Sequence, residues 1–281
     1  MTAAPELRRR GQLEVLVWPA FDGLGVDVMV TTRHGGVSRG AYESLNLGLH
    51  VGDDDKDVLE NRWRAASALG ADLGDMVFCN QAHGREVRIV TSGDRGRGSL
   101  ALDDAIASTD ALVTAEPGIV LVVMVADCVP IVLYDPVVHV LACVHAGWRG
   151  TVSRVSEAAV EAMRTLGSRP ENIVAGVGPA IHPDAYQVGA DVLEAARQCF
   201  TSDHDQVIRP DGSGKWLFDL WTANQIVLRE AGVRDENSQV ATLPTGSGGP
   251  GLFFSDREIR PCGRFAAVAR LGPRGVGQRV L

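Results

Sequence analysis

Three apolar runs follow one another almost without a break in the middle of the chain, at residues 119–126, 130–134 and 137–145. Their side chains are apolar at odd and even positions alike, which is typical of central strands buried on both faces. Each run is far shorter than the ~20 residues that a membrane-spanning helix needs. We therefore expect a sheet that other elements cover on both sides.

Strand-like and helix-like stretches alternate on either side of these runs. Further strands are expected at 13–18, 26–32, 86–91, 173–177 and 265–271. Helices are expected at 57–69, 151–166, 190–200 and 220–231. Because no internal repeat and no Pro/Gly-rich linker divides the chain, we predict one domain over residues 1–281. The predicted fold class is α+β (mixed α/β), a compact mixed β-sheet core flanked by helices.

The charge balance disfavours two classes of partner. The chain has 27 Lys and Arg against 35 Asp and Glu, a net charge of −8, so its surface repels nucleic-acid phosphates and anionic lipids. We therefore expect no nucleic-acid and no membrane partner. Arg8, Arg9 and Arg10 look like the start of a secretion signal, but no uninterrupted apolar stretch follows them, and we expect a cytoplasmic protein. Nothing in the sequence indicates the oligomeric state.

Two histidines and one cysteine lie at apparent strand ends. His83 lies in NQAHGREV, Cys128 in VMVADCVPIV and His145 in CVHAGWRG, and one strand separates Cys128 from His145, so adjacent strands can bring them close. The five cysteines are widely spaced and form no Cys-x-x-Cys pair, which disfavours disulfides and a zinc ribbon. Two imidazoles and a thiolate suit Zn²⁺ better than Mg²⁺ or Ca²⁺, and three protein ligands leave one position open for a reactant. These residues are therefore a candidate catalytic metal site.

The same residues allow other interpretations. Cys128 and His145 could act as nucleophile and base of a cysteine hydrolase. A copper site that oxidises phenols is a second alternative, although the seven histidines include no His-x-His pair of the kind that multicopper oxidases use. A structural zinc site is a third. Cys143 shares a strand face with His145, two residues away, and we interpret it as a core residue.

The segment HAGWRG leads directly into the helix expected at 151–166. Backbone N–H groups at a helix N-terminus, together with Arg149, would form an anion site. The alternative is an ordinary turn in which Arg149 pairs with a carboxylate. Asp127, next to Cys128, is a candidate general acid/base, and its alternative role is to cap a turn.

Short segments spread over nearly the whole chain carry a family resemblance: TTRHGGVSRGAYESLNLGLHVGDD, VLENR, QAHG, TDALVT, VADCVPI, HAGWRG, GVGPAIHPDAYQVG, FDLWTANQIVLREAGV and LFFSDR. With them the sequence resembles the bacterial laccase-domain, or multicopper-oxidase-like, proteins. This family has a human immune-cell homologue, and its members are now treated as purine nucleoside phosphorylases.

The resemblance implies a Zn²⁺ ion held by His83, Cys128 and His145. It implies phosphorolysis of adenosine, inosine, guanosine and S-methyl-5′-thioadenosine, together with adenosine deamination, so purine nucleosides and phosphate are the expected partners. The implied fold is a mixed β-structure flanked by helices, with a distant likeness to toxin deamidases. Some members are described as copper-dependent polyphenol oxidases and others as editing factors for peptidoglycan precursors, which leaves copper as the alternative metal.

Five residues are expected to serve the substrate. Asp127 is the candidate for proton transfer, Arg149 and Arg33 are candidates for binding phosphate, and Gln81 and Asn46 are candidates for contacting the nucleoside. Gln81 also has a possible role in orienting His83, two residues further along.

Two positions depart from the family pattern. Ala241 stands where members commonly have cysteine, and Glu258 stands where an arginine is usual. Arg257 and Arg264 are retained. If the missing arginine binds an anion, the affinity for that anion would be altered.

Overall fold

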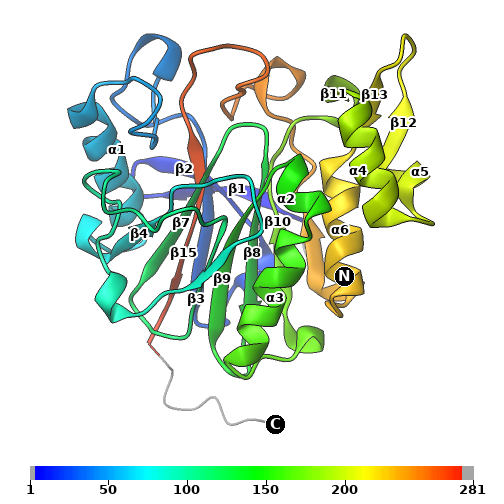
Figure 1. Ribbon diagram of the computed structural model, residues 1–281. Coiled ribbons are helices and arrows are strands. Elements are labelled where there is room, and N and C mark those ends of the chain that lie inside the picture. Colours follow the sequence, from blue (N-terminus) through cyan, green and yellow to red (C-terminus); the bar gives the residue numbers. More distant parts are fainter. Residues whose placement is uncertain (1–3, 274–281) are drawn as a thin grey trace.

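The computed structural model describes residues 4–273 and consists of two large β-sheets packed face to face with helices on their outer sides (Figure 1). The first sheet has six strands in the order β1 (Glu6–Arg10), β2 (Leu13–Val17), β3 (Val26–Thr31), β15 (Phe265–Leu271), β7 (Val120–Val125) and β4 (Met76–Phe78). The second has six in the order β14 (Ser238–Val240), β10 (Val174–Val177), β8 (Val129–Asp135), β9 (Val140–Ala146), β6 (Ala111–Thr114) and β5 (Val87–Ile89). A small sheet joins β11 (Gln187–Val188), β13 (Trp216–Phe218) and β12 (Ile208–Pro210).

The helices cover the two outer faces. Helix α1 (Asp55–Ser67) packs on the first sheet, and α3 (Val155–Thr165), α4 (Ala190–Phe200) and α6 (Leu220–Glu230) pack on the second (Figure 1). Shorter helices are α2 (Trp148–Val152) and α5 (His204–Val207). Single 3₁₀ turns are η1 (Pro19–Phe21), η2 (Gly40–Tyr42), η3 (Leu73–Asp75), η4 (Ser92–Asp94), η5 (Pro170–Asn172), η6 (Pro183–Ala185), η7 (Asp235–Asn237) and η8 (Gly246–Gly248).

The apolar runs form strands buried on both faces, as expected, except that the third strand begins at Val140 and Val137 lies exposed in the turn before it. In β7, Leu121 and Val123 lie in the core between the two sheets, whereas Val122 lies in the core under α1. In β9, Cys143 lies between the sheets and Val144 lies under α3 and α6. The prediction that Cys143 is a core residue is confirmed, since its side chain is fully buried. The fold class is α+β, and the likeness to toxin deamidases stays a prediction.

The helix expected at 151–166 was wrongly placed at its start. A helical turn begins earlier, at Trp148, and ends at Val152, and a second helix begins at Val155. Between them Arg154 adopts a left-handed conformation with φ 63°, which interrupts the helical hydrogen bonds. Its side chain forms ion pairs with Glu157 and Glu230, which stabilise this kink.

Several strands were not predicted because they are short or polar. Strand β6 has four residues, and β1 contains three consecutive arginines yet pairs antiparallel with β2 at the sheet edge. The irregular segment 31–54 is ordered: Asn61 of α1 bonds to the backbone of Val37, Ser44 and Asn46 within it. Within residues 4–273, no helix has the length and apolar character needed to cross a membrane.

Candidate metal centre

Cys128 and His145 meet because they lie on neighbouring antiparallel strands. His145 lies near the end of β9 and is paired with Pro130 at the start of β8, directly after Cys128. We expected Cys128 to lie at the end of the strand formed by the run 119–126, and this was wrong. That strand, β7, ends at Val125 and belongs to the first sheet, whereas β8 and β9 belong to the second. The turn that carries Cys128 therefore crosses from one sheet to the other, and Cys128 lies directly before β8.

His83 is brought to this point by a buried carboxylate. It lies in the loop between β4 and β5, in a left-handed conformation with φ 58°. Asp110, which directly precedes β6, accepts hydrogen bonds from the backbone N–H groups of Ala82, His83 and Gly84 at 3.3, 2.9 and 2.7 Å. The same carboxylate accepts a bond of 2.8 Å from Nδ1 of His145. One side chain thus fixes the His83 loop against β9.

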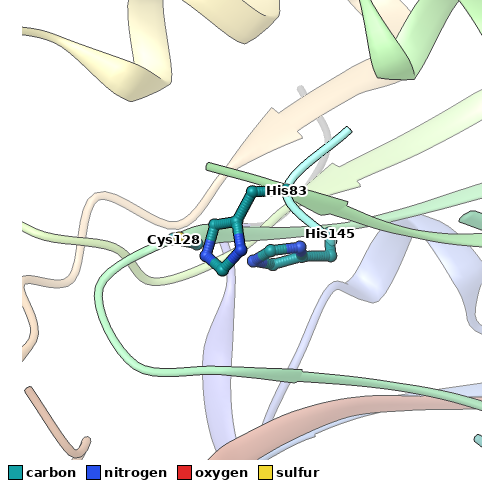
Figure 2. Close-up of side chains that lie close together, drawn as sticks. All are labelled: His83, Cys128 and His145. Atoms are coloured by element: carbon teal, nitrogen blue, oxygen red, sulfur yellow. The ribbon is translucent and has the colours of Figure 1, made fainter. Parts of the chain in front are cut away.

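The three side chains converge on one point (Figure 2). The ligand atoms of His83, Cys128 and His145 lie within 4.8 Å of one another, and the two imidazole rings are nearly perpendicular with centroids 4.7 Å apart. Ligands of a tetrahedral zinc ion lie about 3.5 Å apart, given bond lengths of about 2.1 and 2.3 Å. Small side-chain rotations therefore suffice, and the donor set of two nitrogens and one sulfur fits Zn²⁺.

The electrostatics of the site favour the ligating form of the thiol. Burial opposes ionisation of Cys128, but the charge of His145 and hydrogen bonds from His145 and His83 outweigh it and lower the pKa of the thiol to about 6. Burial also opposes charging of His145, yet Cys128 and Asp110 together raise its pKa to about 9. The pKa of Asp110 is lowered: burial raises it, but the bonds from His145 and the loop N–H groups prevail. A thiolate is therefore present near neutral pH.

Gly147 lies against the side chains of Cys128 and His83, and its lack of a side chain leaves room for them. A Cβ atom at this position would lie 2.9 Å from Sγ of Cys128 and 3.0 Å from Cδ2 of His83. The backbone of Gly147, at φ −76°, is open to any residue, so the requirement for glycine here is one of space alone.

Gly147→Ala is accordingly expected to reduce turnover by about 100-fold, because displacing a reacting group by about 1 Å has an effect of that size. Steady-state kinetics on the purified variant measure it. Gly74→Ala is the matched control, since a Cβ there meets no atom within 4 Å. Equal activity of the two variants would contradict the crowding argument.

A cavity of about 570 Å³ opens beside the three ligands. Its lining includes four arginines but only two aspartates, an excess of positive charge in a chain whose net charge is −8. It is lined by His50, Cys79, Asn80, Gln81, His83, Leu102, Met124, Val125, Ala126, Asp127, Cys128, His145, Trp148, Arg149, Ile181, Tyr186, Asp256, Arg257, Arg260 and Arg264.

The four arginines differ in their partners. Arg260 and Arg264 both form ion pairs with Asp256. Arg149 stacks on the ring of Trp148 and Arg257 donates to a backbone carbonyl, and within residues 4–273 neither forms an ion pair with a carboxylate. Their charges are therefore available to an anion in the cavity.

Two of the other candidates lie in the cavity but are already hydrogen-bonded. The side-chain amide of Gln81 donates to the carbonyl of Met124 at 2.7 Å and accepts from its N–H at 2.8 Å. The carboxylate of Asp127 accepts from the hydroxyl of Thr245 at 2.5 Å and from the N–H of Arg257 at 2.7 Å. These hydrogen bonds favour structural roles for both residues. For Asp127 this is the turn-capping role considered above as the alternative to proton transfer, and for Gln81 it is a positioning role rather than a contact with the nucleoside.

Arg33 and Asn46 do not line the cavity. Arg33 donates to the backbone of the 31–54 segment and lies over the ring of Phe254. Asn46 is fully buried and accepts a hydrogen bond from the N–H of Arg264, so it acts on the cavity through that arginine. Glu258, which departs from the family pattern, also lies outside the lining.

The sequence analysis did not predict that Asp110 contacts the candidate ligands, nor that the arginine-rich loop at 256–264 lines the same cavity. Asp110 lies in the segment TDALVT, and an acidic residue at the very start of a buried strand was the available signal. Arg257 and Arg264 were noted only as retained family positions, because nothing in their spacing placed them in the same cavity as His83.

Comparison with known proteins identifies the relatives of this chain. Residues 27–272 match the family model described as multi-copper polyphenol oxidoreductase laccase. A protein named purine nucleoside phosphorylase YlmD from Bacillus subtilis is 38% identical over 228 residues, 81% of each chain. A protein named adenosine deaminase RL5, from an unknown prokaryotic organism, is 41% identical over 76% of this chain and 81% of its own. The crystal structure of the hypothetical protein YfiH from Bacillus licheniformis superposes with a TM-score of 0.89 at 34% identity, covering 94% and 98% of the two chains.

Proposed function

The chain belongs to the multi-copper polyphenol oxidoreductase laccase family, and from this we propose that it is a zinc-dependent purine nucleoside phosphorylase that also deaminates adenosine. The proposed substrates are adenosine, inosine, guanosine, S-methyl-5′-thioadenosine and phosphate. The names of its relatives, purine nucleoside phosphorylase and adenosine deaminase, support both activities. The observation that carries the proposal is a His–Cys–His metal site at the wall of an arginine-lined cavity.

The metal ligands are proposed to be His83, Cys128 and His145. A bound zinc ion would supply Lewis-acid polarisation and a water molecule with its pKa lowered to about 7. Three protein ligands leave a coordination position open, which is the arrangement of catalytic zinc rather than of structural zinc. The family description names copper, and the two imidazoles and the thiolate also suit that metal.

The cavity residues have separable roles in phosphorolysis. Arg149 and Arg257 carry charges that no carboxylate offsets within the described chain, and we assign them to the phosphate. Trp148 and Tyr186 offer aromatic surface to a purine ring. Both arginines lie beside these rings, with Arg149 over Trp148 and Arg257 over Tyr186, so phosphate and nucleoside would lie side by side.

Incubation of the purified protein with inosine and phosphate is expected to yield hypoxanthine and ribose-1-phosphate, identified by chromatography. Omitting phosphate should stop hypoxanthine release, and adenosine without phosphate should yield inosine. Zinc analysis of protein purified without added metal should give about one ion per chain, as three ligands predict. Release of hypoxanthine at the same rate without phosphate would exclude a phosphorylase.

A second candidate is a cysteine hydrolase acting on amide substrates. It is favoured by the bond of 2.8 Å between Asp110 and His145, because a nucleophile, a base and a residue that orients the base form a hydrolytic triad. A chelator separates the two candidates. It should abolish nucleoside phosphorolysis, whereas a cysteine hydrolase would remain active and would be inactivated by Cys128→Ser.

A further inference from the structure

Asp110 occupies a place between two metal ligands that the proposed chemistry does not use directly. Its side chain is fully buried. Burying a carboxylate is unfavourable by several kcal/mol unless hydrogen bonds replace its water. Here both oxygens are supplied with donors from the protein, and every donor belongs to a segment that carries a metal ligand.

Each carboxylate oxygen of Asp110 accepts two of these hydrogen bonds. Oδ1 accepts from the N–H of His83 at 2.9 Å and from Nδ1 of His145 at 2.8 Å. Oδ2 accepts from the N–H groups of Gly84 at 2.7 Å and Ala82 at 3.3 Å. In addition, the backbone carbonyl of Asp110 accepts from the N–H of His145 at 2.8 Å.

These bonds determine which nitrogen of His145 is free. A carboxylate accepts only, so Nδ1 of His145 carries the proton in this bond, and Nε2 is the nitrogen left to a metal ion, which would displace any proton there. They also hold His83 in its left-handed conformation, which a residue with a side chain rarely adopts without support.

We propose that Asp110 is the positioning residue of the metal centre: it selects the tautomer of His145 and holds the His83 loop at the distance that the ion requires. This inference rests on the proposed metal site, but it is independent of which reaction that site performs. Asp110 is fully buried and does not line the cavity, so its effect is on metal affinity and on ligand geometry.

Asp110→Asn tests this role because asparagine has the same shape but carries one acceptor and one donor group. If its oxygen takes the place of Oδ1, the NH₂ group faces the N–H of Gly84. If the amide is reversed, the NH₂ group faces Nδ1 of His145 and favours the tautomer that protonates the ligating nitrogen. Neither orientation satisfies all four donors.

The expected result is a 10- to 100-fold lower affinity for Zn²⁺, the usual effect of losing the partner of a metal-bound histidine. Competition of the full-length protein with a chromophoric chelator measures it. Asp135→Asn is the matched control. Asp135 is also fully buried and accepts hydrogen bonds from the backbone N–H groups of Val137 and Arg169. It is the last residue of β8, at the end of the strand away from Cys128. The control should keep the affinity of the wild type.

Equal affinity of Asp110→Asn and wild type for Zn²⁺ would overturn the inference, whereas a wild-type chain that binds no Zn²⁺ would instead overturn the proposed metal centre. A measurement on the unchanged protein guards against misfolding of the variant. Nitrogen NMR of the histidine rings in the zinc-loaded wild type should show His145 protonated at Nδ1 and bound through Nε2. Coordination through Nδ1 would rule out the role given to Asp110.

Discussion

Replacing Cys128 by alanine is expected to lower kcat/KM for inosine phosphorolysis by more than about 100-fold. Loss of the partner of a metal ligand already reduces metal affinity or activity by about 10- to 100-fold, so loss of the ligand itself should have the larger effect. The variant keeps two imidazoles but has no thiolate beside them, and two neutral ligands hold zinc weakly. Chromatographic assay of hypoxanthine, combined with zinc analysis of the variant, measures the loss.

Cys143→Ala is the matched control for that experiment. Cys143 is a buried cysteine on the same face of β9 as His145, two residues away, and its sulfur faces the backbone of Leu121. Its replacement removes apolar volume, which is expected to lower the free energy of unfolding by about 1 kcal/mol and to leave turnover unchanged. If Cys128→Ala and Cys143→Ala lose activity equally, the assignment of Cys128 as a ligand is wrong.

Arg62→Met is expected to lower the free energy of unfolding by about 3–5 kcal/mol. Arg62 of α1 is fully buried and donates to the carbonyls of Leu47, Gly98 and Ser99 at 2.8, 2.6 and 2.8 Å. Bonds from a charged donor contribute about 1.5–3 kcal/mol each, and the sum is partly offset because the variant no longer buries a charge. Burial lowers the pKa of Arg62 to about 9, so the side chain is still cationic at neutral pH.

Urea denaturation followed by circular dichroism measures this change, and the melting temperature should fall on the order of 10 °C. Arg64→Met on the same helix is the control: Arg64 is partly exposed and pairs with Glu60 at 2.8 Å, an interaction worth less than about 1 kcal/mol. Should the two variants prove equally stable, the three buried carbonyls do not depend on Arg62. Arg62 matters for function too, since it anchors Leu47 in the segment that carries His50 to the cavity.

The turn between β7 and β8 links the candidate metal centre to the arginine-rich loop. Asp127 adopts a left-handed conformation with φ 84°, and its carboxylate bonds to Thr245 and to the backbone of Arg257. The next residue is Cys128, so one turn sets both the sulfur ligand and the start of the loop that brings Arg257 and Arg264 to the cavity. These hydrogen bonds give the carboxylate of Asp127 a structural role that requires no proton transfer.

The sequence alone determined which segments are buried and which residue types could hold a metal ion. β7 is apolar at every position, and β8 and β9 are apolar on both faces apart from Tyr134 and Asp135 near the end of β8 and His145 near the end of β9, so these strands had to lie in the centre. The amphipathic spacing likewise placed α4 at Ala190–Phe200 and α6 from Leu220 within a residue of the observed bounds. The positions of His83, Cys128 and His145 at apparent strand ends, together with their donor chemistry, predicted them as candidate ligands, and the structure brings their side chains together.

Only the tertiary structure decided how these parts are arranged around the site. Strand pairing uses backbone hydrogen bonds that are the same for any sequence, so nothing in the pattern assigns β7 and β8 to different sheets or inserts β15 between β3 and β7. The same holds for Asp110, whose acceptor role depends on N–H groups of a loop 26 to 28 residues away in the chain. Arg33 and Arg257 are equally basic in sequence, and the choice of Arg257 for the cavity follows from the turn at Asp127, a contact 130 residues distant.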